Sequence, residues 1–339
     1  MAQAAVLANH ALGSCDGSRP WLGAFTRETC GFLVNPPADE AHPRLVLNLL
    51  LGHWSLDSKI VPDNNRRLGA CSWDQRMSPS PPVVLAFAAS DPTGGAGIQA
   101  DLLTLASLGC HPLSVLTGLT VQDTRGVEGM LAIEPALVER QARHVLQDIP
   151  VAVFKLGVLG SAGNARAIAA VLAEHPRTPV VLDPVLASGR GDALADIESL
   201  EALRSVLLPR ATILTPNSLE ARRLTGAAPD ADLAGCAREL ARLGCTYVLV
   251  TGTHEEGADV VNTLYNAHGA VREDRWQRLS GSYHGSGCTL ASAIAALLAK
   301  GAAVEEAVRQ AQEYTWKSLA AGFSPGHGQA IPDRFFKSR

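Results

Sequence analysis

The segment 280–290 reads Ser-Gly-Ser-Tyr-His-Gly-Ser-Gly-Cys-Thr-Leu and leads directly into a long helical pattern. Its glycines let backbone N–H groups turn toward one point, and the helix that begins near Cys288 adds the positive end of its dipole there. This arrangement predicts an anion hole for a phosphoryl group in transfer, formed by Gly285, Ser286, Gly287 and Cys288. An ordinary glycine-rich helix start has the same pattern, so the segment by itself leaves both interpretations open.

A second glycine-rich segment, 89–101, reads Ala-Ser-Asp-Pro-Thr-Gly-Gly-Ala-Gly-Ile-Gln-Ala-Asp and joins a strand pattern to a helix pattern. Its glycines, Gly95 among them, let the backbone lie close to a bound molecule. Asp101 is expected on the first turn of the helix, where it could accept a hydrogen bond from a substrate or merely offset the helix dipole. The glycine spacing matches neither the dinucleotide-binding fingerprint nor the P-loop.

Polar side chains also follow later strand patterns. Asp183 ends one apolar run and is followed by a proline, and Asn217 and Glu220 lie three apart at a helix start, so they share a face. An amide and a carboxylate in that position could hold Mg²⁺ through water. The alternatives are a turn-forming Asp-Pro pair and a capping box with Asn217 as N-cap.

Gln122 follows another apolar run. A side-chain amide presents a donor and an acceptor together, so it could read the edge of a heterocycle. The alternative is a solvated loop residue.

Short apolar runs alternate with helical patterns from Val83 onward. The strands are expected at Val83–Ala88, Leu113–Leu119, Ala152–Leu156, Val180–Asp183, Thr212–Leu214 and Tyr247–Val250, with a weaker hairpin over 262–272. The helices are expected at Ile98–Leu108, Pro135–Gln147, Ala162–Glu174, Leu200–Leu207, Ser218–Leu224, Leu233–Leu243, Cys288–Lys300 and Val304–Ala320. Alternation of this kind predicts an α/β fold with a mostly parallel sheet, helices on both faces, and ligands beyond the carboxyl ends of the strands.

Composition narrows the class of protein. The chain has 339 residues, a net charge of −4 and no run of Lys or Arg, which argues against a nucleic-acid-binding protein. No apolar stretch has the length of a membrane span, and the N-terminus has no secretory pattern. Seven cysteines without metal-like CxxC spacing favour a reduced, cytoplasmic location over a disulfide framework.

Residues 1–78 differ from the rest of the chain. They show little sustained period, and Ser-Pro-Ser-Pro-Pro follows Met77. We therefore divide the chain into an extension, 1–78, and a catalytic domain, 79–339. The extension is interpreted as poorly ordered or as a mis-assigned start, with a regulatory appendage as the alternative, and a chain that begins at Met77 is expected to fold.

The segments, in this order, resemble the hydroxymethylpyrimidine/phosphomethylpyrimidine kinases of the ribokinase-like superfamily. The motifs that carry the resemblance are S-D-P-T-G-G-A-G-I-Q-A-D, V-Q-D, K-L-G, V-L-D-P-V, T-P-N-S-L-E and H-G-S-G-C-T-L. The resemblance implies a cytoplasmic homodimer that uses Mg²⁺ and ATP to phosphorylate 4-amino-5-hydroxymethyl-2-methylpyrimidine, and then its monophosphate, in thiamine diphosphate synthesis. The alternatives are a pyridoxal or pyridoxine kinase and a pyrimidine-binding sensor with little turnover.

The same resemblance implies roles for single residues. Its pyrimidine contacts would be Asp101, Gln122, Gly95 and Val158; its phosphate and nucleotide contacts would be Asp183, Asn217, Thr251 and His327; and Mg²⁺ would be held by Asp183 and Glu220. Cys288 stands where sugar kinases carry an aspartate base, so a thiolate with a lowered pKa at the helix N-terminus could take the hydroxyl proton. It could equally act by hydrogen bonding, with its backbone N–H on the phosphoryl group, or be a buried small hydrophobe. Lys155 is expected to be structural, in the interior of a strand.

Two departures from the family pattern concern positive charge. The strand 247–250 is followed by Thr251 where the family often has a lysine, and 326–329 reads Gly-His-Gly-Gln where some members have Gly-Lys-Gly. Thr251 is the feature that favours a sensor, whereas His327 could donate to phosphate when protonated.

Overall fold

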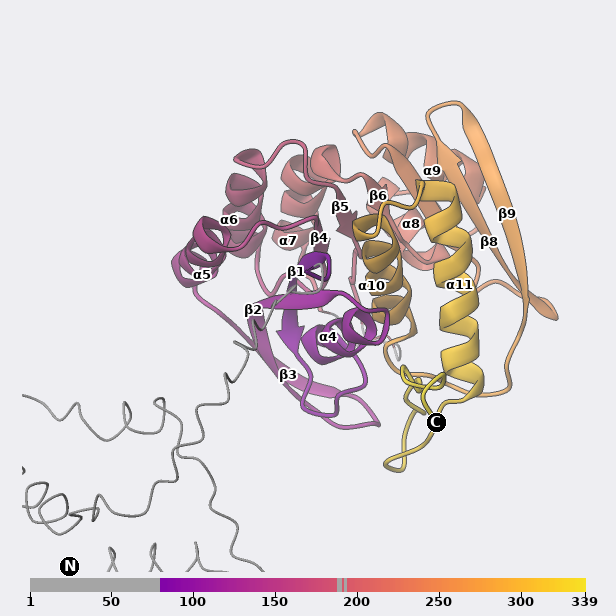
Figure 1. Ribbon diagram of the computed structural model, residues 1–339. Helices are drawn as coiled ribbons and strands as arrows, with labels where there is room; N and C mark the ends of the chain where they lie inside the picture. Colours follow the sequence, from indigo (N-terminus) through magenta and orange to yellow (C-terminus); the bar gives the residue numbers. More distant parts are fainter. Residues whose placement is uncertain (1–79, 188–190, 192–193) are drawn as a thin grey trace, which may run out of the picture. The chain divides into compact units, whose positions relative to one another are not determined.

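Consecutive residues of the central strands are buried on opposite faces of one sheet. In strand β1 (Val83–Ser90), Val84 packs into one hydrophobic cluster and Leu85 into another. This alternation without exposed positions explains why the central strands are short apolar runs. The computed structural model describes residues 80–187, 191 and 194–339 (Figure 1).

The sheet has nine strands in the order β3-β2-β1-β4-β5-β6-β7-β8-β9. Neighbouring strands in the series β2, β1, β4, β5, β6 and β7 pair in parallel. Strand β3 pairs antiparallel with β2 at one edge, and β8 and β9 form antiparallel pairs at the other edge. The bounds are β2 His111–Gln122, β3 Val127–Ala132, β4 Val153–Leu156, β5 Val180–Leu182, β6 Ile213–Leu214, β7 Tyr247–Thr251, β8 Asp259–Asn266 and β9 Gly269–Gln277.

Helices cover both faces of this sheet (Figure 1). One face carries α5 (Pro135–Asp148), α6 (Ala162–Ala173), α7 (Ile197–Ala202), α8 (Ser218–Thr225) and α9 (Leu233–Arg242). The other carries α4 (Gly97–Ser107), α10 (Ser286–Ala299) and α11 (Val304–Ala320). The expected ribokinase-like α/β architecture is therefore confirmed, and α10 contributes its small apolar side chains to the centre of the second face.

The differences from the expected elements have local causes. Strand β3 was not expected, because its sequence Val-Glu-Gly-Met-Leu-Ala lies on an exposed edge and lacks a regular apolar period. The helix expected over 200–207 is α7 followed by a π-helical turn, Leu203–Leu207. The hairpin expected over 262–272 is the pair β8 and β9, and the proposed extension 1–78 lies outside the described residues.

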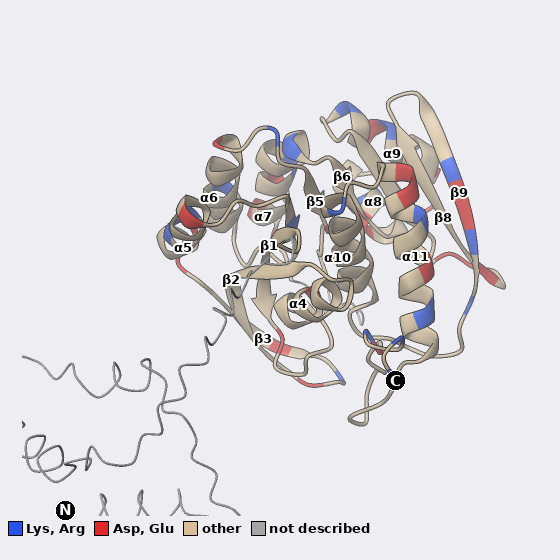
Figure 2. Cartoon of the chain, in the orientation of Figure 1, with Lys and Arg blue, Asp and Glu red and all other residues tan. Residues whose placement is uncertain are grey.

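Charged side chains of both signs alternate on the outer elements (Figure 2). On α11, Arg309 pairs with Glu306, and Lys317 with Glu313, at helical spacing. Across the part of the chain that the structure describes, no helix is both long and apolar enough to cross a membrane.

Candidate active site

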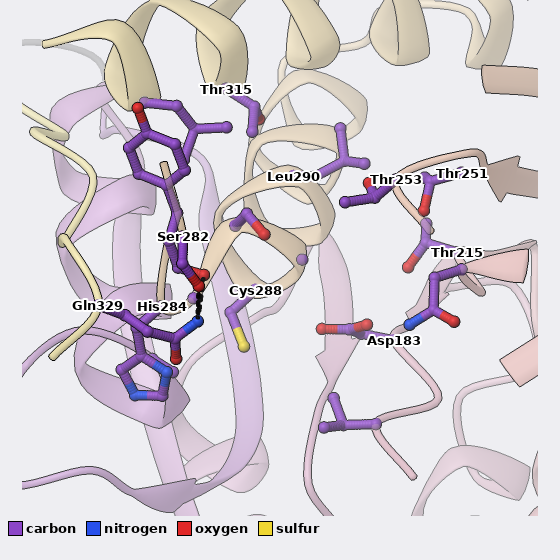
Figure 3. A pocket seen from close by; sticks show the side chains of 18 of the residues that line it. Asp183, Thr215, Thr251, Thr253, Ser282, His284, Cys288, Leu290, Thr315 and Gln329 are labelled. Atoms are coloured by element: carbon purple, nitrogen blue, oxygen red, sulfur yellow. Dashed lines mark hydrogen bonds between the residues drawn. The ribbon is translucent and has the colours of Figure 1, made fainter. Parts of the chain in front are cut away.

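The carboxyl ends of the parallel strands and the start of α10 enclose a cavity of about 390 Å³. Residues that follow β4, β5 and β6 reach it, because parallel strands end at the same edge of the sheet. Figure 3 shows side chains from these different elements facing one space. Of the residues expected in the site, those that line the cavity are Gln122, Val158, Asp183, Asn217, Glu220, Thr251, Gly285, Ser286, Gly287 and Cys288.

The start of α10 has the form of an anion hole. Gly285 is the N-cap with a left-handed φ of 80°, which an L side chain rarely adopts. The first N–H groups of a helix have no intrahelical partner, so those of the residues after Gly285 remain available to an anion. A Cβ atom added at Gly287 would lie 3.8 Å from Asp183 Oδ1. The turn therefore faces the Asp183 carboxylate across the cavity.

The two glycine turns contact each other directly. A Cβ atom at Gly285 would lie 1.9 Å from the carbonyl oxygen of Gly95, so only glycine permits this approach. Gly95 is buried in this contact and does not line the cavity, although Ala96 and Gly97 do. The expected contact of Gly95 with a pyrimidine is thus replaced by a structural contact with the anion hole.

Asp91 and His284 form a second link between the turns, which the sequence analysis missed. Asp91 accepts hydrogen bonds from the N–H groups of Thr93 and Ala96, at 2.8 and 2.6 Å, and its Oδ2 lies 2.9 Å from His284 Nε2. Burial opposes ionisation, but the bonds from His284, Ala96 and Thr93 outweigh it and lower the pKa of Asp91 to about 2. The Ser-Asp-Pro sequence was the available signal, since an aspartate before such a turn often caps backbone N–H groups.

Asp101 lies beneath the cavity and not on its wall. It is fully buried, pairs with Lys155 Nζ at 2.8 Å and accepts a hydrogen bond of 2.7 Å from Ser292 Oγ. Helix α4 begins at Gly97, so Asp101 is on the second turn and faces α10, and not on the first turn as expected. The structure thus places Asp101 in a buried ion pair, and its expected contact with the pyrimidine stays a prediction.

Lys155 is in the interior of β4, as expected, but it carries a charge into the core below the site. Its Nζ lies 4.0 Å from Asp183 Oδ2 in addition to its pairing with Asp101. Burial alone would lower the pKa of Lys155, but Asp101, Cys288 and Asp183 hold it above its ordinary value. A positive charge thus stands behind the carboxylates of the cavity.

Asn217 and Glu220 form the capping box that was one of the two interpretations of this segment. Asn217 Oδ1 accepts from the Glu220 N–H, and Glu220 Oε2 from the Asn217 N–H, both at 2.9 Å. Both residues nevertheless line the cavity, so capping and ligand binding do not exclude each other. Burial and the nearby Asp183 raise the pKa of Glu220 to about 8.

Asp183 is the other acidic side chain that the resemblance placed near the phosphates. It is 4% exposed, and among the described residues its Oδ2 has no hydrogen-bond partner. Burial raises the pKa of Asp183 to about 6, against the opposing effect of Lys155. Two carboxylates that resist ionisation therefore face the same cavity, which is the condition that a cation relieves.

Cys288 differs from the expected thiolate. Its side chain is buried, and burial together with the nearby carboxylates raises its pKa to about 12, despite Lys155 and a bond from the Gly97 N–H. The desolvation cost exceeds the effect of the helix N-terminus. The neutral thiol hydrogen-bonds with Asp183, and Figure 3 shows both groups projecting into the same space.

The remaining expected residues are divided between the wall and the surface. Gln122 is the last residue of β2, and its Nε2 donates to Thr120 Oγ1 at 2.8 Å. His327 is exposed and does not line the cavity, and its expected contact with phosphate stays a prediction. Gln329 lines the cavity instead and donates to Ser282 Oγ at 2.7 Å, as marked in Figure 3.

Tryptophan side chains on the far wall were also missed. Trp276 of β9 and Trp316 of α11 line the cavity with ring centroids 6.5 Å apart. Gln312 joins Trp276 to β8, since its Oε1 accepts from Trp276 Nε1 and from Asn262 Nδ2. An aromatic wall of this kind suits a planar ligand, but strand β9 alone gave no signal that Trp276 would face inward.

Comparisons with known proteins agree with this geometry. The family model described as phosphomethylpyrimidine kinase matches residues 91–333. A hydroxymethylpyrimidine/phosphomethylpyrimidine kinase of Streptomyces coelicolor is 44% identical over 255 residues, which are 74% of this chain and 93% of that protein. The thiamine biosynthesis bifunctional protein ThiED of Geobacter sulfurreducens is 44% identical over 91% of this chain and 62% of its own length. That second match therefore extends into the residues before 80.

Solved structures show the same fold. A pyridoxal kinase of Bacillus subtilis, determined as an ADP complex, superimposes with a TM-score of 0.69 at 29% identity, over 75% of this chain and 98% of its own. A phosphomethylpyrimidine kinase of Clostridium difficile gives a TM-score of 0.61 at 34% identity, over 69% of this chain and 97% of its own.

The anion hole can be tested by two glycine substitutions that should differ in their effect on the free energy of unfolding. Gly287→Val places a side chain in van der Waals contact with Asp183, within the expected anion hole, so activity should fall at least ~100-fold, while the free energy of unfolding changes by no more than about 1 kcal/mol. Gly285→Ala, the matched variant, forces the two turns apart and should lose about 2 kcal/mol or more as well as activity. Steady-state rates and urea unfolding measure both. Full activity of Gly287→Val would remove this turn from the mechanism.

The protonation state of Cys288 can be tested by replacement and by labelling. Because its pKa is raised to about 12, Cys288→Ser should keep the rate within roughly tenfold, since a hydroxyl also donates to Asp183. Iodoacetamide should label the Cys288 peptide no faster at pH 8 than that of Cys245, whose pKa burial also raises to about 12. If the labelling rate of Cys288 instead reached half of its maximum below pH 8, a reactive thiolate would be established.

Proposed function

The chain belongs to the phosphomethylpyrimidine kinase family and is a phosphotransferase, and we propose that it transfers the γ-phosphoryl group of ATP to the hydroxymethyl oxygen of 4-amino-5-hydroxymethyl-2-methylpyrimidine. The resulting monophosphate is the proposed second acceptor, and thiamine diphosphate synthesis is the pathway, as the names of the relatives suggest.

The observation that carries this proposal is the position of the Gly287 turn opposite Asp183. A Cβ atom at Gly287 would lie 3.8 Å from Asp183 Oδ1, and both residues line the cavity, so the backbone of the turn and the carboxylate face it close to each other. Donors fixed before the reaction stabilise negative charge without reorganisation, and phosphoryl transfer depends mainly on this and on positioning. A site that merely held a pyrimidine would not need these unpaired amides beside a carboxylate.

The hydroxyl group needs no strong base in this arrangement. The neutral Cys288 thiol and the Asp183 carboxylate form a hydrogen-bonded pair next to the turn. In a loose transition state the attacking oxygen keeps its proton until late, so positioning contributes more than proton abstraction. Cys288 is accordingly proposed as a packing and hydrogen-bonding residue of the anion hole, with its own N–H directed to the phosphoryl group.

We assign the two halves of the cavity to the two substrates. The pyrimidine is proposed to bind beside Gln122 and Val158, where an amide and an apolar side chain line the wall. ATP is proposed to extend past Asn217 and Thr251, with its base toward the tryptophans of β9 and α11.

The residues present fit Mg²⁺, which is proposed to accompany ATP. The described residues contain no group of three or more metal-binding side chains, so Asp183 and Glu220 would hold the ion together with phosphate oxygens and water. The unpartnered Oδ2 of Asp183 and the raised pKa values of both carboxyl groups support this assignment. The ion would neutralise negative charge on the phosphates.

Pyridoxal is the alternative acceptor that a specific observation favours, since the Bacillus subtilis pyridoxal kinase is similar in fold at 29% identity. A weakly catalytic sensor is favoured only by Thr251, which stands where the family often has a lysine. The buried positive charge of Lys155 beneath the cavity weakens this argument, because the site has a positive charge without that lysine. We further propose a cytoplasmic homodimer, on the basis of the family resemblance and of four free cysteines among the described residues.

The acceptor can be identified by measuring ADP release with each candidate alcohol at saturating Mg·ATP. We expect the highest kcat/KM with the hydroxymethylpyrimidine, activity with its monophosphate, and a lower value with pyridoxal. Gly287→Val provides the control for contaminating kinases. A higher kcat/KM for pyridoxal would reassign the substrate, and the absence of ADP release with all three alcohols would contradict the proposed function.

The Mg²⁺ assignment predicts a pH-dependent stabilisation. Because the pKa of Glu220 is raised from 4.5 to about 8, the folded protein keeps a proton that the unfolded chain releases, so this contribution to stability is complete below pH 4.5 and is lost as the pH rises toward 8. Mg²⁺ replaces that proton, so it should raise Tm more at pH 8 than at pH 5.

Glu220→Gln is the informative variant for this measurement, because glutamine at this position still permits the capping box. It should lose most of the Mg²⁺-dependent rise in Tm at pH 8, whereas Glu305→Gln, an exposed control on α11, should retain it. An equal Mg²⁺ response of both variants would contradict the assignment of Glu220 as a ligand.

A further inference from the structure

Arg334 is a buried arginine with no acidic partner of its own. It is 4% exposed, and within the described residues no carboxylate forms an ion pair with its guanidinium. Its electrostatic neighbours are Cys288, Tyr314, Asp101 and Asp91. Asp101 also pairs with Lys155, and the ionised Asp91 also hydrogen-bonds with His284. A buried charge that forms no ion pair of its own is costly, so its hydrogen bonds must account for its retention.

The guanidinium bridges the two glycine turns. Nη1 donates to the Gly94 carbonyl at 3.2 Å and Nη2 to the Gly95 carbonyl, so the fork holds the first turn. Nε donates to Thr289 Oγ1 at 3.2 Å, and that hydroxyl in turn donates to the Gly285 carbonyl at 2.8 Å. One side chain thus joins the first turn to the N-cap of α10.

The backbone of Arg334 is anchored from the opposite direction. Its carbonyl accepts a hydrogen bond of 2.7 Å from Tyr314 Oη, which also lies 2.7 Å from Ser107 Oγ. The adjacent Asp333 N–H donates to the Ser318 carbonyl at 2.9 Å. The C-terminal segment is therefore held on α11 and α4 while its arginine reaches back to the turns.

We propose that Arg334 is a positioning residue for phosphoryl transfer, which holds the two glycine turns in place relative to each other and keeps a buried positive charge next to the anion hole. The proposal rests on the kinase function above. Arg334 does not line the cavity, so it acts through the backbone of the turns.

The test separates charge from structural support by comparing Arg334→Lys with Arg334→Met. Lysine keeps the positive charge but lacks the planar set of guanidinium N–H donors, whereas methionine keeps only the approximate volume of the side chain. We expect kcat to fall about 100-fold in Arg334→Met and about tenfold in Arg334→Lys, with KM for the pyrimidine changed less than threefold in both. Arg339→Met, an exposed arginine of the same segment, is the control and should behave as wild type.

A second measurement does not depend on activity. Inorganic phosphate is titrated in a thermal-shift assay, and its half-maximal concentration should rise about tenfold in Arg334→Met but less than threefold in Arg334→Lys. If Arg334→Met does not fold, Thr289→Val, which removes the hydroxyl between Arg334 and Gly285 but keeps the charge, should lower kcat about tenfold, as Arg334→Lys does.

The outcomes are distinct. Equal loss of phosphate affinity in the lysine and methionine variants, or a fall in kcat no larger than that of Arg339→Met, would overturn the role of Arg334. The variants could instead bind phosphate in the expected order while the wild-type protein releases no ADP with any alcohol. That outcome would contradict the proposed function and leave the charge of the anion hole established.

Discussion

The site depends on a contact between two backbones. The carbonyl of Gly95 approaches Gly285 so closely that Gly285 cannot carry a side chain, and the left-handed conformation of Gly285 then directs the first N–H groups of α10 into the cavity. Asp91 with His284 on one side, and Arg334 on the other, hold the turns together. Distant parts of the chain are therefore needed before the anion hole has a fixed shape.

A second constraint is the energetic cost of burying the charged side chains beneath the cavity. Lys155, Asp101 and Asp183 are all nearly or fully buried, and each is retained because its neighbours offset the cost of removing charge from water. The same burial keeps the thiol of Cys288 neutral and raises the pKa values of Asp183 and Glu220. The cavity therefore holds a neutral thiol beside two carboxyl groups that resist ionisation, and not a nucleophilic thiolate.

Much of the fold follows from local pattern. The buried central strands are recognisable as short apolar runs because both of their faces are covered, and α10 and α11 are recognisable by their helical period. Strand β3 escaped recognition because an exposed edge strand has no buried face to impose a period. The capping box of Asn217 and Glu220 was readable because its partners are only three residues apart.

The sequence alone determined the class of fold, the two glycine turns and the family, since each depends on residues that are close together in the chain. Only the tertiary structure decided which polar side chains face the cavity. Asp101 turned inward because α4 begins early enough to place it against α10 and Lys155, and His327 stayed outside while Gln329 entered. Arg334 acquired its partners from segments about 240 residues away. Orientation and burial of this kind arise from the packing of whole elements, which no local pattern of residues specifies.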